Sequence, residues 1–101
     1  MAERTEQPFA KEVNRLRQKH GLSISALAER TGFSQPYVSR VLRQADYKTP
    51  SLKLARSVAR AFGLPDDYFR EYREAYVIEK VRKHPGLRNQ LYAIVREREP
   101  R

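Results

Sequence analysis

The chain has 101 residues, enough for one domain with a modest core, and it carries a formal net charge of +9. It contains no cysteine, which excludes disulfides, cysteine-ligated zinc and thiol chemistry. No apolar run approaches the ~18 residues that cross a bilayer, so a membrane partner is not expected. The charge favours a polyanionic partner. Residues 1–65 carry twelve Lys or Arg against five Asp or Glu, whereas residues 66–101 carry nine against seven.

Three short helices are predicted before residue 45. Apolar residues recur at i, i+4 and i+7 from Phe9, and they predict a helix that ends at Gly21, a residue type favoured after helix C-termini. Ser23 is placed to cap a second helix, which Gly32 ends, and Ser34 to cap a third. The serines at the expected helix starts and the glycines at the expected helix ends therefore predict three consecutive helices with short connections.

The rest of the chain is also expected to be helical. Residues 45–50 predict a loop, and Ser51 is placed to cap a fourth helix that Gly63 ends. The segment Pro65-Asp66-Asp67 is typical of a helix start, so a fifth helix is expected from there to about His84. Pro85-Gly86 breaks it, and residues 87–97 predict a final helix.

The whole chain thus predicts an all-α fold, because no alternating strand pattern is present. We expect a compact bundle of four or five helices, followed by one or two C-terminal helices. The predicted domains are residues 1–65 and a helical extension over residues 66–101.

The most informative stretch runs from Ile24 to Leu42. Two short helices joined by such a short turn must cross steeply to share a core. Ala28 must then be small because the next helix packs over it, and Gly32 suits a turn position with positive φ. The inner faces are expected to bury Leu27, Phe33, Val38 and Val41. The side chains left outward on the later helix are Gln35, Pro36, Ser39, Arg40 and Arg43.

This stretch resembles the phage-repressor-like (Xre-type) helix-turn-helix family. The resemblance lies in the small residue Ala28, the glycine four positions later and the aliphatic Val38, together with the run Ser34-Gln35-Pro36-Tyr37-Val38-Ser39-Arg40-Val41-Leu42. It extends from about Phe9 to Phe69 and implies a lambda-repressor-like fold that binds double-stranded DNA. Many members continue the recognition helix into Glu-x-Gly, whereas this chain continues with Arg43-Gln44-Ala45.

The resemblance also implies roles for single residues. Gln35 and Arg40 align with base-reading positions, and these side chains can bond adenine and guanine bidentately. Ser39 is expected to reach a base edge or a phosphate, and Pro36 to meet a thymine methyl group. Tyr37 either stacks on the DNA backbone or props the recognition helix. The expected base readers are Gln35, Pro36, Ser39 and Arg40. The expected backbone contacts are Ser23, Ser34, Tyr37, Arg43, Lys48 and Lys53.

The C-terminal extension carries more apolar surface than a small headpiece needs. Tyr68, Tyr72 and Tyr76 recur at i, i+4 and i+8, and a second stripe follows after Pro85. Either the last helix folds back over the fifth, or two copies pair there. We expect a homodimer. The residues expected at its interface are Tyr68, Phe69, Tyr72, Tyr76, Leu91, Ile94 and Val95.

The pattern carries no enzyme signature. His20 and His84 are isolated at helix ends, so no metal is expected, and Asp66-Asp67 fits a helix start better than an acid–base pair. We expect no catalytic residues and no cofactor. The resulting hypothesis is a cytoplasmic, nucleoid-associated transcriptional repressor that binds a palindromic operator. Two alternatives stay open: an architectural or antitoxin-type DNA-binding protein whose tail binds another protein, and an adaptor that binds protein alone.

Overall fold

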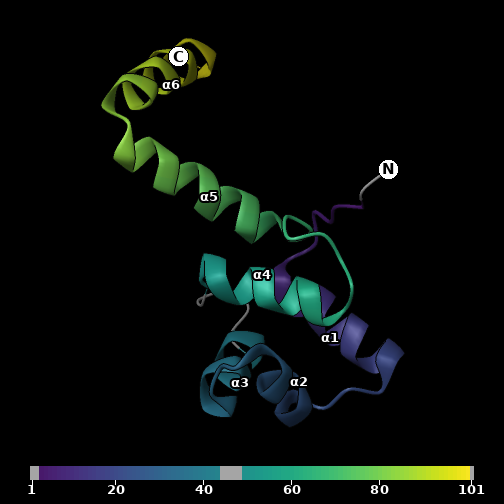
Figure 1. Ribbon diagram of the computed structural model, residues 1–101. Helices are drawn as coiled ribbons and strands as arrows, with labels where there is room; N and C mark the ends of the chain where they lie inside the picture. Colours follow the sequence, from purple (N-terminus) through teal and green to yellow (C-terminus); the bar gives the residue numbers. More distant parts are fainter. Residues whose placement is uncertain (1–2, 44–48, 101) are drawn as a thin grey trace.

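The computed structural model describes residues 3–43 and 49–100 (Figure 1). Within these residues every regular element is helical, so the predicted all-α fold is confirmed. The six helices are α1 (Phe9–His20), α2 (Ile24–Thr31), α3 (Gln35–Arg43), α4 (Leu52–Ala61), α5 (Arg70–Lys83) and α6 (Pro85–Arg98).

Several of the predicted helix caps are present, and they explain where the early helices begin or end. The Ser23 hydroxyl accepts the backbone N–H of Ala26 at 3.0 Å, and the Ser51 hydroxyl accepts that of Leu54 at 3.1 Å. Each bond satisfies an amide that has no partner inside its own helix. Gly21 follows α1 in the left-handed conformation, with φ 62°. Local sequence therefore sets the start of α2 and α4 and the end of α1, whereas α4 ends at Ala61, two residues before the predicted Gly63.

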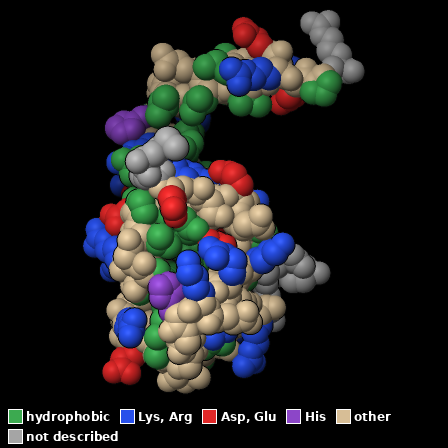
Figure 2. Space-filling view, turned by 90° about the vertical axis from the view of Figure 1, so that its right-hand side faces the viewer, with side chains coloured by type: hydrophobic (Ala, Val, Ile, Leu, Met, Phe, Trp, Pro, Cys, Tyr) green, Lys and Arg blue, Asp and Glu red, His purple; other side chains and the backbone are tan. Residues whose placement is uncertain are grey.

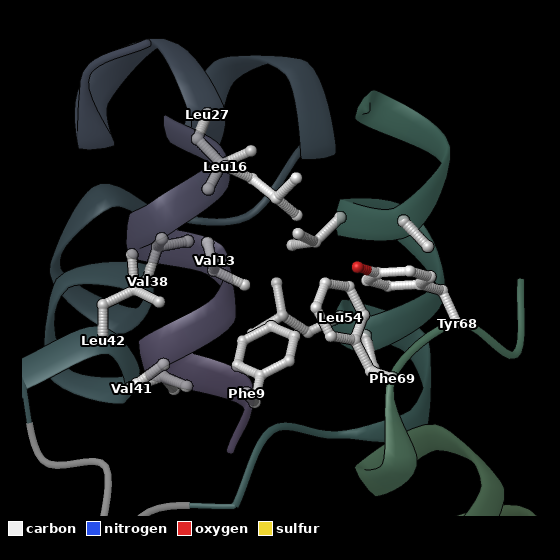
Figure 3. Close-up of a cluster of buried hydrophobic side chains, with 14 of the residues drawn as sticks. Phe9, Val13, Leu16, Leu27, Val38, Val41, Leu42, Leu54, Tyr68 and Phe69 are labelled. Carbon is white, nitrogen blue, oxygen red and sulfur yellow. The ribbon is translucent and has the colours of Figure 1, made fainter. Parts of the chain in front are cut away.

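Helices α1 to α4 and the segment before α5 enclose one hydrophobic core. Figure 3 shows Phe9 and Val13 of α1 facing Leu54 of α4, with Phe69 beside them. The Phe9 and Phe69 rings meet edge to face, with centroids 4.7 Å apart. The core residues are Phe9, Ala10, Val13, Leu16, Leu27, Ala28, Val38, Val41, Leu42, Leu54, Ala55, Val58, Ala59, Tyr68 and Phe69.

The start of the fifth helix differs from the prediction. α5 begins at Arg70, because the preceding Phe69 is buried in the core and has an extended backbone, with φ −85° and ψ 137°. Asp66 binds Arg60 of α4 at 2.7 Å, and Asp67 binds Arg4 at 2.7 Å. Residues 66–69 therefore belong with the first four helices, and we call residues 3–69 the headpiece and α5 with α6 the arm.

Two residues predicted for the dimer stripe are consequently placed elsewhere. Tyr68 is 6% exposed and Phe69 0% exposed, both within the headpiece core. They precede α5, so Tyr68 does not continue the stripe of Tyr72 and Tyr76. The expectation that Tyr68 and Phe69 line a dimer interface is corrected, because a side chain enclosed by its own chain has no surface left for a second copy.

One carboxylate is buried in the headpiece. Glu12 of α1 is 4% exposed and accepts two hydrogen bonds from the guanidinium of Arg15, each 2.8 Å long, and one from the Tyr68 hydroxyl. These donors, Arg15 above all, hold the pKa of Glu12 below its usual value. The same residues tie α1 to the segment that leads into the arm.

The arm projects from the headpiece (Figure 1), and α6 continues beyond the end of α5 at an angle rather than folding back over it. The radius of gyration is 15.7 Å, larger than the ~13 Å of a compact domain of this length. Figure 2 shows hydrophobic side chains at the surface of the arm, including the bend between its helices. None of the helices described is long and apolar enough to span a membrane.

Candidate nucleic-acid interface

Helices α2 and α3 form the predicted helix-turn-helix. Ala28 of α2 is 4% exposed, which agrees with the need for a small residue under the next helix. Gly32 ends α2 with φ 77°, and its N–H donates to the Ala28 carbonyl at 2.9 Å. This left-handed conformation is open to glycine at little cost. The chain reverses there and enters α3 three residues later.

Helix α3 has one face in the core and one in solvent. Val38 and Val41 are each 1% exposed, so packing fixes the rotation of the helix about its axis. Four of the five side chains predicted to face outward are exposed, and Ser39 is partly exposed. The structure therefore brings the expected base readers Gln35, Pro36, Ser39 and Arg40 onto one helix with a defined outer face. Their contacts with DNA stay predictions.

The serines predicted to contact phosphates lie at helix N-termini. Ser34 is exposed, and its hydroxyl accepts the N–H of Tyr37 at 3.3 Å, while Ser23 caps α2. Helix N-termini present free N–H groups and a positive dipole end, the features that bind phosphate. Lys53 is exposed in the first turn of α4. Lys48, also predicted to contact the backbone, lies outside the described residues.

The sequence left two roles open for Tyr37, and the structure shows its contacts within the protein. Its ring packs against Phe33, with centroids 5.7 Å apart, and its hydroxyl accepts the backbone N–H of Ser51 at 3.5 Å. Phe33 itself is partly buried rather than fully enclosed. Tyr37 thus connects the recognition helix to the start of α4, which is the propping role; its contact with DNA stays a prediction.

Two residues that position α3 were not predicted from the sequence. The Asn14 side-chain amide donates to the Leu42 carbonyl near the end of α3 at 3.5 Å. Arg17 holds Asn14 through two bonds of 3.2 and 2.7 Å and donates to the Leu22 carbonyl at 3.1 Å. Their spacing of three on α1 was the available signal, since residues i and i+3 share a helix face. They link α1 to the end of α3 and to the connection that precedes α2.

Positive charge is left unneutralised on the motif. Within the described residues no ion pair involves α2 or α3, so Arg40 and Arg43 are without a carboxylate partner there. The ion pairs of the described residues lie on other elements; in one of them the Arg60 guanidinium holds the pKa of Asp66 below its usual value. Cations without internal partners are available to phosphate oxygens, which supply much of the affinity for DNA.

The described residues contain no group of three or more histidine, aspartate or glutamate side chains placed to hold a metal ion. His20 packs against the Phe62 ring, with centroids 5.4 Å apart, and His84 lies between α5 and α6. Neither lies on the outer face of α3. The chemistry that this site offers is hydrogen bonding and charge on an exposed helix.

Comparison with known proteins agrees with this geometry. A protein-family model described as helix-turn-helix matches residues 13–69, more than half of the chain. The match includes α2 and α3 and ends at Phe69, where the headpiece core ends. No curated protein and no solved structure matches the chain. The chain belongs to the helix-turn-helix family of the Xre and lambda-repressor type, a family of DNA-binding regulators.

Proposed function

We propose that the protein is a sequence-specific transcriptional repressor that binds a palindromic operator in double-stranded DNA as a homodimer. One observation carries the proposal: α3 presents a polar face with Arg40 and Arg43, which have no carboxylate partner within residues 3–43 and 49–100, and its opposite face is buried. An α-helix of this kind fits the major groove, where every base pair presents a distinct pattern of donors and acceptors.

In this proposal the outer face of α3 reads the bases. Arg40 bonds O6 and N7 of a guanine, and Gln35 bonds N6 and N7 of an adenine. Pro36 has no donor and meets a thymine methyl group, while Ser39 bonds a base edge or a phosphate. Phosphate contacts set the register without reading sequence. We assign them to Ser23, Ser34, Tyr37, Arg43, Lys48 and Lys53.

The experiment is selection of bound sequences from a random duplex library at ~150 mM salt, followed by affinity measurement for two variants. Arg40→Ala is expected to weaken binding by ~1–3 kcal/mol and to relax the preference at one base pair. Lys53→Ala, the matched control for charge, is expected to weaken all sequences alike and to lower the salt slope by about one.

The bound pool also tests the homodimer. Half-sites about 34 Å apart, one helical turn, are expected for a dimer with one recognition helix per copy. If Arg40→Ala leaves both affinity and preference unchanged, α3 does not read the bases.

The exposed arm favours a second candidate. In an architectural or antitoxin-type protein the same headpiece binds DNA, and the apolar arm holds a different protein. Salt-sensitive binding without sequence preference is expected in that case, together with a partner that co-purifies. Absence of salt-sensitive DNA binding would instead favour an adaptor that binds protein alone.

A further inference from the structure

Helix α6 carries an apolar stripe that the described residues leave largely exposed, with Leu91 partly buried. Leu87, Leu91, Ile94 and Val95 recur at i, i+4, i+7 and i+8, which places them on one helix face. Leu87 is 39%, Ile94 44% and Val95 52% exposed. Large apolar side chains gathered on one face of a small protein indicate a surface that another molecule covers.

The chain cannot cover this stripe with its own α5. Only His84 separates Lys83, the last residue of α5, from Pro85, the first of α6. Antiparallel helix pairs need loops of two to about five residues to reverse direction. Proline also excludes the helical conformation at the residue before it, and His84 is extended, with φ −129° and ψ 91°. The bend therefore holds α6 away from α5 and leaves the stripe open to a second copy.

A suitable receiving surface lies on α5 itself. A groove of about 410 Å³ lies beside its first half, lined by Tyr72, Tyr76 and Val77, with Asp66, Asp67 and Arg73 toward the headpiece. Val77 is 52% and Tyr76 45% exposed. The groove is thus mostly apolar along α5, and carboxylates lie near the helix N-terminus.

We propose that α6 of one copy lies antiparallel in the α5 groove of a second copy, and that the second copy returns the same contact. This exchange rests on the homodimer of the proposed function and specifies how the two copies pair. Both helices have 14 residues, about 21 Å, so each covers the full length of the other.

The antiparallel register follows from matching spacings. Tyr72 and Tyr76 are four residues apart on α5, as are Leu91 and Val95 on α6, so Tyr72 lies opposite Val95 and Tyr76 opposite Leu91. The same register brings Arg98 of α6 to the level of the receiving copy's aspartates before α5. Their side chains are partly exposed, 42% for Asp66 and 34% for Asp67, and so accept a further cation.

The available area suits a second copy. Five large apolar side chains of the groove and the stripe are 39–52% exposed: Tyr76, Val77, Leu87, Ile94 and Val95. This corresponds to roughly 400 Å² of apolar surface per copy, close to the apolar share of the ~800 Å² that each partner buries in a stable interface. Because the exchange uses both the stripe and the groove of each copy, one symmetric contact covers both surfaces.

The first test is disulfide trapping in the full chain, which has no cysteine of its own. Tyr76→Cys and Leu91→Cys are made in separate chains of different size, mixed, and oxidised mildly. The mixed disulfide is expected as the main product, since the register brings the two positions within bonding distance. Asn89→Cys, exposed and on the opposite face of α6, is the matched control and is expected to give little mixed product with Tyr76→Cys.

The outcomes distinguish failure of the proposed α6 exchange from failure of the homodimer as such. If Leu91→Cys links mainly to another Leu91→Cys, α6 pairs with α6 and the exchange is overturned, although the homodimer stands. If the unmodified chain is a monomer at tens of micromolar, both the exchange and the homodimer are overturned. Base reading is judged separately, by Arg40→Ala.

A second variant keeps the test independent of cysteine chemistry. Val95→Glu places a charge in the stripe and is expected to shift the solution mass from dimer to monomer, whereas Asn89→Glu is expected to leave it a dimer. Binding of Val95→Glu to a single half-site is expected to be unchanged, because α6 lies outside the headpiece. A dimeric Val95→Glu would contradict the proposed face.

Discussion

Removal of the Phe69 ring tests whether the segment before α5 belongs to the headpiece core. Phe69 is fully buried, and its ring packs edge to face against Phe9 and Tyr68, with centroids 4.7 and 5.1 Å away. Phe69→Ala removes both contacts and leaves a cavity between α1 and α4. The headpiece is small, so it has few other contacts with which to compensate.

The expected loss is about 4 kcal/mol of the free energy of unfolding. Truncation of a buried phenylalanine to alanine costs ~3–5 kcal/mol of the free energy of unfolding. Edge-to-face aromatic pairs contribute stability beyond that of the buried area. A headpiece of this size is expected to have roughly 3–10 kcal/mol in total. Phe69→Ala therefore removes much or all of the stability and leaves a large unfolded fraction at room temperature.

The assay is urea unfolding followed by circular dichroism, at one protein concentration because dimerisation contributes to apparent stability. With a slope of ~1–2 kcal/mol per molar urea, the midpoint is expected to fall by about 2–4 M. Tyr92→Ala, an aromatic truncation at a position 65% exposed, is the control and is expected within about 0.5 kcal/mol of the unmodified chain. A loss below ~1 kcal/mol for Phe69→Ala would refute the core assignment.

Two further predictions concern the contacts around the headpiece. The pKa of Glu12 is lowered chiefly by its bonds to Arg15, so this pair stabilises the fold above the ordinary carboxyl pKa of ~4.3, and the contribution is lost as pH falls through the lowered value. Glu12→Gln is expected to be less stable at neutral pH and to show a weaker decline in acid; equal pH profiles in urea titrations would contradict this. Tyr37→Phe is expected to lose about 0.5–1 kcal/mol of stability and to keep its affinity for DNA, because the hydroxyl bonds the start of α4. An equal loss of affinity for all DNA sequences would assign the hydroxyl to the DNA backbone.

Much of the fold follows from signals that act within a few residues. The caps Ser23 and Ser51 bond amides three positions later, and Gly32 adopts the left-handed conformation that its turn requires. The apolar spacing from Phe9 identifies the buried face of α1. These interactions form between near neighbours in the chain, so the sequence alone shows them. The outer face of α3 follows by the same logic, because the buried Val38 and Val41 leave the other side to solvent.

The beginning of α5 was decided by contacts between distant residues. Pro65-Asp66-Asp67 has the composition of a helix start, yet Asp66 binds Arg60 and Asp67 binds Arg4. Glu71 of α5 accepts the N–H of Phe9 at 3.0 Å, which supplies an α1 amide with a partner that the Pro8 side chain does not provide. Neither arrangement has a sequence signature.

The sequence by itself determined that the chain is helical, where the helix-turn-helix lies and which side chains its second helix presents. Only the tertiary structure decided that Tyr68 and Phe69 close the headpiece core, that Asn14 and Arg17 brace the motif, and that α6 does not fold back over α5. The physical reason is the separation along the chain over which each kind of interaction acts. Capping and helical periodicity depend on residues within one or two turns, whereas core membership and ion pairing depend on which distant surfaces meet once the chain has packed.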